Sequence, residues 1–230
     1  SGNSKIKFKQ RTDYTKIVSI FFNTQDSNLS SRSLRQALSF TAPKIEGEEV
    51  ANNPYPPFLW AYDPDSKKYL SNKDQAQAAL KRAKATISEE KLKGEIILTS
   101  TTNFKEVAEK IIASWRELGL NAKVRIEEGI AQNFQALLIT QSIPPDPDQY
   151  FLWHATQTRT NLTKYDSKRA DKDLEDGRRL IDEQARKEKY LDFQKTLLED
   201  TPAVFLYFPK YNIAYQKKKE AALDKVLSLT

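Results

Sequence analysis

The sequence predicts an α/β domain in which helices flank a central mixed β-sheet. Short apolar runs rich in β-branched and aromatic residues alternate along the chain with longer segments whose apolar residues recur at helical spacing. Such alternation is typical of a sheet that is mixed or mostly parallel. The expected strands of this sheet are residues 17–23, 95–99, 122–126, 134–140 and 203–208. We expect residues 211–215 to pair beside the last of these strands.

Five helices are expected, and several begin at residues that favour helix N-termini. They cover residues 34–40, 72–85, 103–118, 174–180 and 184–198. Asn72, Asn103 and Asp182 are the expected N-caps of three helices, because a short polar side chain accepts a hydrogen bond from a free amide of the first turn. Either Ser31 or Ser33 is expected to cap the first helix. Gly119 suits the position after the third helix, where left-handed backbone is common.

The chain is expected to form one domain with two short flanking segments. No linker rich in glycine, serine or proline divides residues 17–215, which we treat as the domain. Residues 1–16 are interpreted as an N-terminal extension or a cloned start, and residues 216–230 as a peripheral basic tail. Residues 44–69 show no regular period, so we expect an ordered loop pinned by its aromatic side chains.

Composition excludes several classes of site. The net charge is +6, but the basic residues are scattered among acids, whereas a nucleic-acid surface needs a basic face. The absence of cysteine excludes disulfides and thiolate metal sites, and the single histidine excludes a His-rich metal centre. The six glycines form no phosphate-binding loop. No run approaches the ~20 apolar residues of a membrane span. We therefore expect no nucleic-acid partner, no membrane span, no metal and no cofactor.

The most distinctive stretch is residues 144–154, which follow the fourth expected strand. It combines three prolines, two acids, three aromatic residues and the only histidine. Prolines make this turn stiff, and ligands of α/β sheets lie outside the carboxyl ends of strands. The alternative is a surface turn whose aromatic side chains pack on the core. Asp146 and Asp148 are spaced to permit a carboxylate pair, but Asp-Pro-Asp is common turn chemistry and recurs at residues 63–65.

Six polar or aromatic residues stand at or just beyond the ends of expected strands. The candidate ligand-binding residues are Asn23, Gln141, Ser142, Trp153, His154 and Tyr207. We expect them to share one exposed surface, because α/β sheets bind ligands at strand ends. The alternative is that Trp153 and Tyr207 are buried.

Several motifs, taken in order, resemble one family. They include Ser-Leu-Arg-Gln-Ala-Leu-Ser at residues 33–39 and Asp-Pro-Asp-Gln-Tyr at residues 146–150, within a resemblance that spans residues 17–215. The family is that of the family 5 extracellular solute-binding proteins of bacterial ABC importers, which includes oligopeptide-, dipeptide- and nickel-binding proteins. The resemblance implies a periplasmic-binding-protein-like fold of type II, and it covers only the C-terminal lobe, lobe II.

The resemblance also implies a function. Family members enclose a solute between two lobes that close like a hinge, so this chain is expected to supply one wall of the cleft. Its implied partners are a peptide or another small solute, the missing first lobe and the importer's membrane subunits. The implied location is extracytoplasmic, with a lipoprotein anchor in the full-length protein. Oligopeptide binders place an Asp just ahead of the proline-containing turn, where it pairs with the peptide's α-amino group; here Ile143 stands at that position.

Two other functions remain open. The first is an interaction or scaffold domain that kept the fold but lost solute binding, which Ile143 and two shortened loops favour. The second is an enzyme built on Asp146, Asp148 and His154. The resemblance favours a non-catalytic binding module over both.

Overall fold

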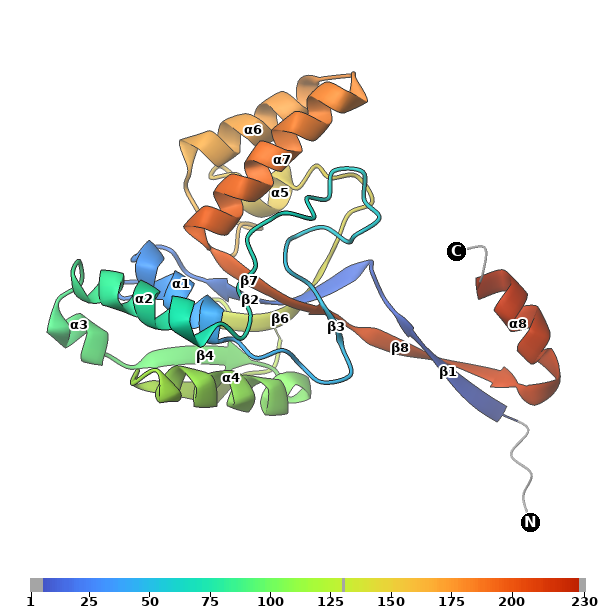
Figure 1. Ribbon diagram of the computed structural model, residues 1–230, viewed down its shortest axis with the longest axis horizontal. Helices are drawn as coiled ribbons and strands as arrows, with labels where there is room; N and C mark the ends of the chain where they lie inside the picture. Colours follow the sequence, from blue (N-terminus) through green and yellow to red (C-terminus); the bar gives the residue numbers. More distant parts are fainter. Residues whose placement is uncertain (1–5, 130, 228–230) are drawn as a thin grey trace, which may run out of the picture.

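The structure, a computed structural model, describes residues 6–129 and 131–227 and is built on a six-stranded mixed sheet (Figure 1). The strand order is β3-β7-β2-β6-β4-β5, and the bounds are β2 (Lys16–Phe22), β3 (Glu49–Val50), β4 (Ile96–Ser100), β5 (Ala122–Ile126), β6 (Ala136–Ser142) and β7 (Ala203–Phe208). β2 runs antiparallel to both β6 and β7, whereas β4 is parallel to β5 and β6. The expected α/β class with a mixed central sheet is confirmed.

All five expected strands are present. β5 and β7 have the expected bounds, β2 and β4 shift by one residue, and β6 begins and ends two residues later than expected. The sequence analysis missed β3, because a two-residue strand inside a proline-rich loop has no visible period. β3 pairs with β7 at the edge of the sheet.

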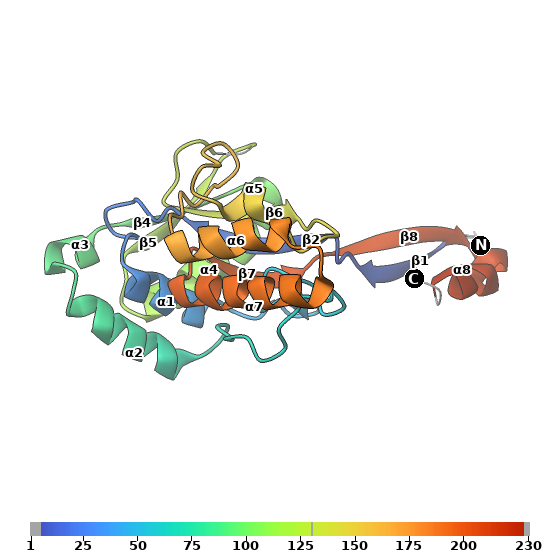
Figure 2. The same ribbon diagram turned by 90° about the horizontal axis from the view of Figure 1, so that it is seen from above.

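The sixth expected strand pairs with a different partner. β8 (Lys210–Gln216) pairs along its whole length with β1 (Ile6–Thr12), in a separate two-stranded antiparallel sheet. The expectation that residues 211–215 would pair beside β7 is therefore wrong, because β1 lies in the segment that the sequence analysis interpreted as an extension. The β1–β8 ribbon projects away from the six-stranded sheet, and the start of β1 and the end of β8 lie at its free end (Figures 1 and 2).

The helices are α1 (Arg32–Thr41), α2 (Lys73–Lys84), α3 (Glu89–Lys93), α4 (Lys105–Glu117), α5 (Tyr150–Trp153), α6 (Lys168–Arg179), α7 (Glu183–Asp200) and α8 (Glu220–Leu227), with 3-10 turns η1 (Thr102–Phe104) and η2 (Lys217–Lys219). Ser31, Asn72 and Asp182 cap α1, α2 and α7, as expected. Asn103 does not cap α4, because it lies inside η1, which leads into the helix. Within the described residues, no helix is both long and apolar enough to cross a membrane.

Two layers of helices cover the sheet, and neighbouring residues of β2 contact one layer each. Phe22 lies 6.4 Å from Trp115 of α4, and the Trp115 indole N–H donates to the carbonyl of Leu38 in α1 at 3.1 Å. Phe21 stacks at 6.0 Å on Trp153 of α5. Successive side chains of a strand point to opposite faces, so these contacts place α1 and α4 on one face and α5 on the other. The core is therefore continuous through β2.

A buried arginine in the Arg-Gln-Ala-Leu motif joins α1 to the end of α7. Arg35 is 4% exposed, and its guanidinium donates to the carbonyls of Leu29 (2.7 Å), Ser30 (3.0 Å), Thr201 (2.9 Å) and Asp200. Burial lowers the pKa of Arg35 to about 10, so the side chain stays cationic at neutral pH. A cation is favoured where the last carbonyls of a helix point outward.

Candidate functional site

The proline-rich turn is fixed to the helices by its two acids. Asp146 accepts from the amide of Asp148 at 2.9 Å, and Asp148 accepts from the amide of Tyr150 at 3.0 Å, so both side chains make turn contacts. Arg186 of α7 pairs with Asp146 at 2.9 Å, and Arg178 of α6 pairs with Asp148 at 3.1 Å. The carboxylates thus stabilise the turn and anchor it to the α6–α7 hairpin. This is the structural role expected of an Asp-Pro-Asp turn, rather than that of a catalytic or metal-binding carboxylate pair.

The tryptophan of this turn is part of the core. Trp153 is 1% exposed and lies between Phe21 and Phe205, at ring distances of 6.0 and 6.2 Å. Its indole N–H donates to the Gln149 side chain at 2.8 Å, and Gln149 in turn donates to the carbonyl of Pro54 at 3.1 Å. A side chain enclosed in this way is not available to a ligand, so the prediction that Trp153 lies on an exposed surface is wrong.

The only histidine is also enclosed. His154 is 4% exposed, and its ring stacks on Tyr150 at 4.1 Å. Its two ring nitrogens lie 2.9 Å from the hydroxyl of Thr156 and 3.2 Å from the carboxylate of Glu175. With both nitrogens partnered and the ring covered, His154 holds α5 against α6 rather than facing solvent.

The remaining candidates do not share one end of the sheet. β2 is antiparallel to β6, so Asn23, which follows β2, lies beside the start of β6 and donates to the carbonyl of Phe134 at 3.2 Å. Gln141 and Ser142 are the last residues of β6, at the other end of the strands, where they pair with Ile17 and Lys16. Tyr207 lies near that second end but is 6% exposed. The prediction of one exposed surface is therefore wrong, and only Gln141 and Ser142 remain accessible at one end.

That end is also where the ribbon joins the sheet. We call this region the ribbon-base surface and define it by the contacting residues Thr12, Tyr14, Glu49 and Phe58, with Glu48 and Gln141 at the same end of the sheet. The amide of Asp13 donates to the carbonyl of Pro209 at 2.7 Å, which ties the two ribbon strands together at their base. The ribbon therefore leaves the sheet in a fixed place, beside the ends of β6 and β7.

A tyrosine–glutamate pair forms the polar centre of the ribbon-base surface. The Tyr14 hydroxyl lies 2.7 and 2.8 Å from the two carboxylate oxygens of Glu49, which also accepts from Thr12 at 3.2 Å. Partial burial raises the pKa of Tyr14 to about 12, and the bond to Glu49 and its negative charge act in the same direction. The Tyr14 hydroxyl therefore stays protonated as a donor at neutral pH.

The same surface presents an exposed ring and unpartnered acceptors. Phe58 is 70% exposed and meets Tyr14 edge-on at 5.3 Å. The side-chain oxygens Oε1 of Gln141 and Oε2 of Glu48 are shielded and have no hydrogen-bond partner within the described residues. Burial raises the pKa of Tyr207 to about 12, with a smaller contribution from the charge of Glu48. The exposed Phe58 ring thus offers an apolar contact at this end of the sheet, which suits the apolar groups of a solute.

The sequence analysis missed most of these residues. Tyr14 lies in the segment interpreted as an extension, and Glu49 and Phe58 lie in the loop without a period. Glu49 reaches the base of the ribbon because β3 pairs with β7, and Tyr14 contacts both Glu49 and Phe58 there. A two-residue strand leaves no signal in the sequence. Gln141 is the one predicted site residue that belongs to this surface.

Comparison with known proteins assigns the chain to a family. Residues 2–162 match the family described as bacterial extracellular solute-binding proteins, family 5 Middle. The oligopeptide-binding protein AppA of Bacillus subtilis is 25% identical over 88% of this chain and 43% of its own length. The dipeptide-binding protein of Escherichia coli is 25% identical over 80% of this chain and 39% of its own length. The chain thus spans less than half the length of these relatives.

Solved structures share the fold along nearly the whole chain. AppA of Bacillus subtilis in complex with a nonapeptide superposes with a TM-score of 0.82 at 22% identity, over 93% of this chain and 48% of that one. NikZ of Campylobacter jejuni in complex with Ni(L-His) gives 0.79 at 21% identity, over 94% and 49%. DppA of Helicobacter pylori in complex with the peptide STSA gives 0.78 at 22% identity, over 94% and 45%. The fold is therefore that of type II periplasmic binding proteins, and the chain belongs to the family 5 bacterial extracellular solute-binding proteins.

Proposed function

We propose that this chain is one wall of a solute-binding cleft in an extracytoplasmic protein that delivers a peptide or another small solute to an ABC importer. The observation that carries the proposal is the likeness over 93% of the chain to about half of a protein that holds a nonapeptide. The proposal assigns no catalytic step to the chain. Its partners are the solute, a second lobe and the importer's membrane subunits.

The ribbon supports the placement of the cleft. β1 and β8 are antiparallel and both cross from the six-stranded sheet to the same free end, where α8 lies against the ribbon (Figures 1 and 2). A second lobe connected through these strands faces the ribbon-base surface. In this proposal Gln141 and Ser142 contact solute, while Asn23 does not.

A second function is favoured by the residue ahead of the proline-rich turn. Ile143 is 8% exposed, and its amide donates to the carbonyl of Thr15 at 2.8 Å. An apolar, buried side chain supplies no charge-assisted bond to an ammonium group. The alternative is a scaffold domain that binds another protein through the ribbon-base surface and takes up no solute.

The test uses the native full-length protein that contains this chain, screened by thermal shift against peptides, metal complexes and sugars and then by calorimetry. We expect a solute that binds in the micromolar range and is bound about tenfold more weakly by Gln141→Leu, because one lost hydrogen bond to a ligand is worth ~1.4 kcal/mol. Asn23→Ala is the matched control at the opposite edge and leaves affinity unchanged. If no class of solute raises the unfolding temperature, the scaffold function replaces the proposal.

A further inference from the structure

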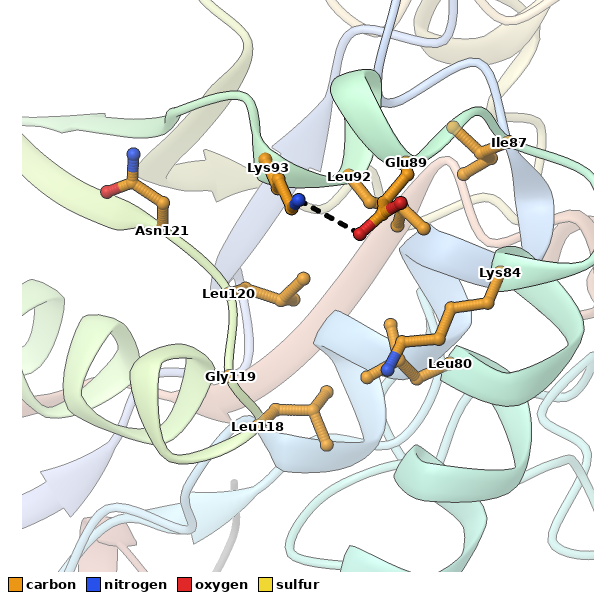
Figure 3. Close-up of a pocket in the computed structure, with 10 residues that line it drawn as sticks. All are labelled: Leu80, Lys84, Ile87, Glu89, Leu92, Lys93, Leu118, Gly119, Leu120 and Asn121. Atoms are coloured by element: carbon orange, nitrogen blue, oxygen red, sulfur yellow. Dashed lines mark ion pairs between the residues drawn. The ribbon is translucent and has the colours of Figure 1, made fainter.

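A cavity is lined by residues of α2 and α3 and of the segment that ends α4 (Figure 3). These elements lie at the end of the molecule away from the ribbon (Figure 1). Its volume is about 590 Å³, within the range of about 300–1,000 Å³ that is usual for small-molecule sites. Five aliphatic and five polar or small residues line it: Leu80, Lys84, Ile87, Glu89, Leu92, Lys93, Leu118, Gly119, Leu120 and Asn121. None of these residues belongs to the ribbon-base surface.

Half of the lining residues are aliphatic, and the charged ones are two lysines and one glutamate. Leu80 and Leu120 are 7% and 6% exposed and form the floor. Lys93 is neutralised by Glu89, its ion-pair partner at 2.9 Å on the rim. Lys84 extends from α2 toward the leucines at the centre of the cavity (Figure 3). Lys84 is exposed, and within residues 6–129 and 131–227 it takes part in no ion pair, whereas Lys93 does.

The cavity has a short, weakly attached cover. α3 has five residues, none of them buried, and Leu92 is its apolar residue packed against the core. Ile87, which precedes α3, packs there too. A ligand that fills the space under Leu92 and Ile87 buries apolar surface that is now partly exposed, which favours binding.

We propose that this cavity binds a free monocarboxylate with an unbranched apolar chain, such as a medium-chain fatty acid. The apolar chain lies against Leu80, Leu118 and Leu120, and the carboxylate pairs with the ammonium of Lys84. The charge of the site selects this occupant, because an alcohol lacks the charge-assisted bond and a cationic amphiphile is repelled by Lys84. The site is distinct from the proposed solute cleft, so either proposal stands if the other fails.

The probe is decanoate, titrated into the 230-residue chain by calorimetry below its micellar concentration, with 1-decanol and decyltrimethylammonium as matched ligands. We expect decanoate to bind most tightly and decyltrimethylammonium least. Lys84→Gln weakens decanoate binding about fivefold, the equivalent of ~1 kcal/mol for a partly exposed ion pair, and leaves decanol binding unchanged. Lys81→Gln, on the same helix but outside the cavity, is the control and changes neither.

A second variant tests the cavity itself. Ile87→Trp fills the space under α3 and abolishes binding of decanoate and decanol alike, while the circular dichroism spectrum stays that of the native fold. The proposal is overturned if decanoate does not bind, if Lys81→Gln weakens it as much as Lys84→Gln, or if Ile87→Trp leaves it intact. Binding only to vesicles of anionic phospholipid, and not to monomeric decanoate, also overturns it, since the ligand is then a membrane surface.

Discussion

Arg35 is the residue on which the contact between α1 and α7 most depends. Its guanidinium satisfies four main-chain carbonyls, among them those of Leu29 and Thr201. Arg35→Ala leaves these carbonyls without a partner, and we expect the free energy of unfolding to fall by ~3 kcal/mol in urea denaturation. Arg32→Ala is the control, because the Arg32 side chain is 61% exposed and its ion pair with Asp200 is 3.4 Å long. An equal loss in both variants would contradict this role for Arg35.

Tyr69 makes the stability of the same region depend on pH. It is 3% exposed, its hydroxyl donates to the carbonyl of Leu198, and burial raises its pKa to about 12. A raised folded pKa means that the contribution to stability is complete below pH 10 and is lost as pH rises toward 12. A shift of one pKa unit corresponds to ~1.4 kcal/mol. Between pH 9 and 11 the free energy of unfolding should therefore fall by about 1 kcal/mol more in the wild type than in Tyr69→Phe. Identical pH slopes of wild type and Tyr69→Phe in chemical denaturation would contradict this prediction. Tyr211→Phe, on the ribbon, is the matched control and should keep the pH slope of the wild type.

At the residue scale, the sequence does not show how deeply a side chain is buried or which groups it contacts. An arginine on a short helix is ordinarily solvated or part of a salt bridge, and only the fold brings the carbonyl-bearing end of α7 beside Arg35. Trp153 and His154 look exposed because they follow a strand and a proline-rich turn, but α6 and β7 cover them. Burial by elements distant in sequence leaves no local pattern, so these contacts were not predictable.

At the element scale, α6 and α7 pack closely because a glycine faces a ring. A Cβ on Gly177 would lie 2.9 Å from Cζ of Tyr190. Alanine favours helices by about 1 kcal/mol over glycine, but this overpacking costs about 1–3 kcal/mol, so we expect Gly177→Ala to destabilise the protein. Urea denaturation of a double-mutant cycle with Tyr190→Leu measures the coupling. If Gly177→Ala costs as much without the ring as with it, the close packing is not the cause.

The ribbon is expected to be the least protected part of the sheet structure. Phe8 and Ile6 of β1 are 70% and 53% exposed, and α8 has no buried residue. Ion pairs of Lys7 and Lys9 with α8 are partly exposed, and such pairs contribute little. In native-state hydrogen exchange, amides of β1 and β8 should therefore exchange much faster than those of β2 and β7. Equal protection in the two sheets would show that the ribbon belongs to the same cooperative unit.

Element prediction succeeded where the pattern is local. β5 and β7 have their expected bounds, because an alternating run and a continuous apolar run both mark strands. The polar cap at Asn72 likewise fixed the start of α2. The pairing of β1 with β8 was not predictable, because about 200 residues separate the two strands and the ribbon has no buried face to impose a period.

At the scale of the whole molecule, the two proposed sites lie at opposite ends. The ribbon-base surface adjoins the strands that lead away from the sheet, and the cavity is lined by the C-terminal part of α2 and by α3. α3 lies at the end of the molecule away from the ribbon (Figure 1). In the proposed function, the ribbon end faces a second lobe and the end with the cavity stays outside the cleft. This separation lets substitutions at Gln141 and Lys84 be interpreted independently.

The central claim is that this chain is half of a cleft, so its affinity for solute depends on a second wall. Small-ligand sites cover about 70–90% of the ligand, whereas one wall covers roughly half, and a loss of ~4 kcal/mol weakens binding about a thousandfold. The most direct measurement is calorimetry of pooled short peptides with the 230-residue chain and, in parallel, with the native full-length protein that contains it. We predict micromolar binding by the longer protein and no measurable binding by the chain alone; micromolar binding by the monomeric chain would contradict the account and make this fold a complete receptor.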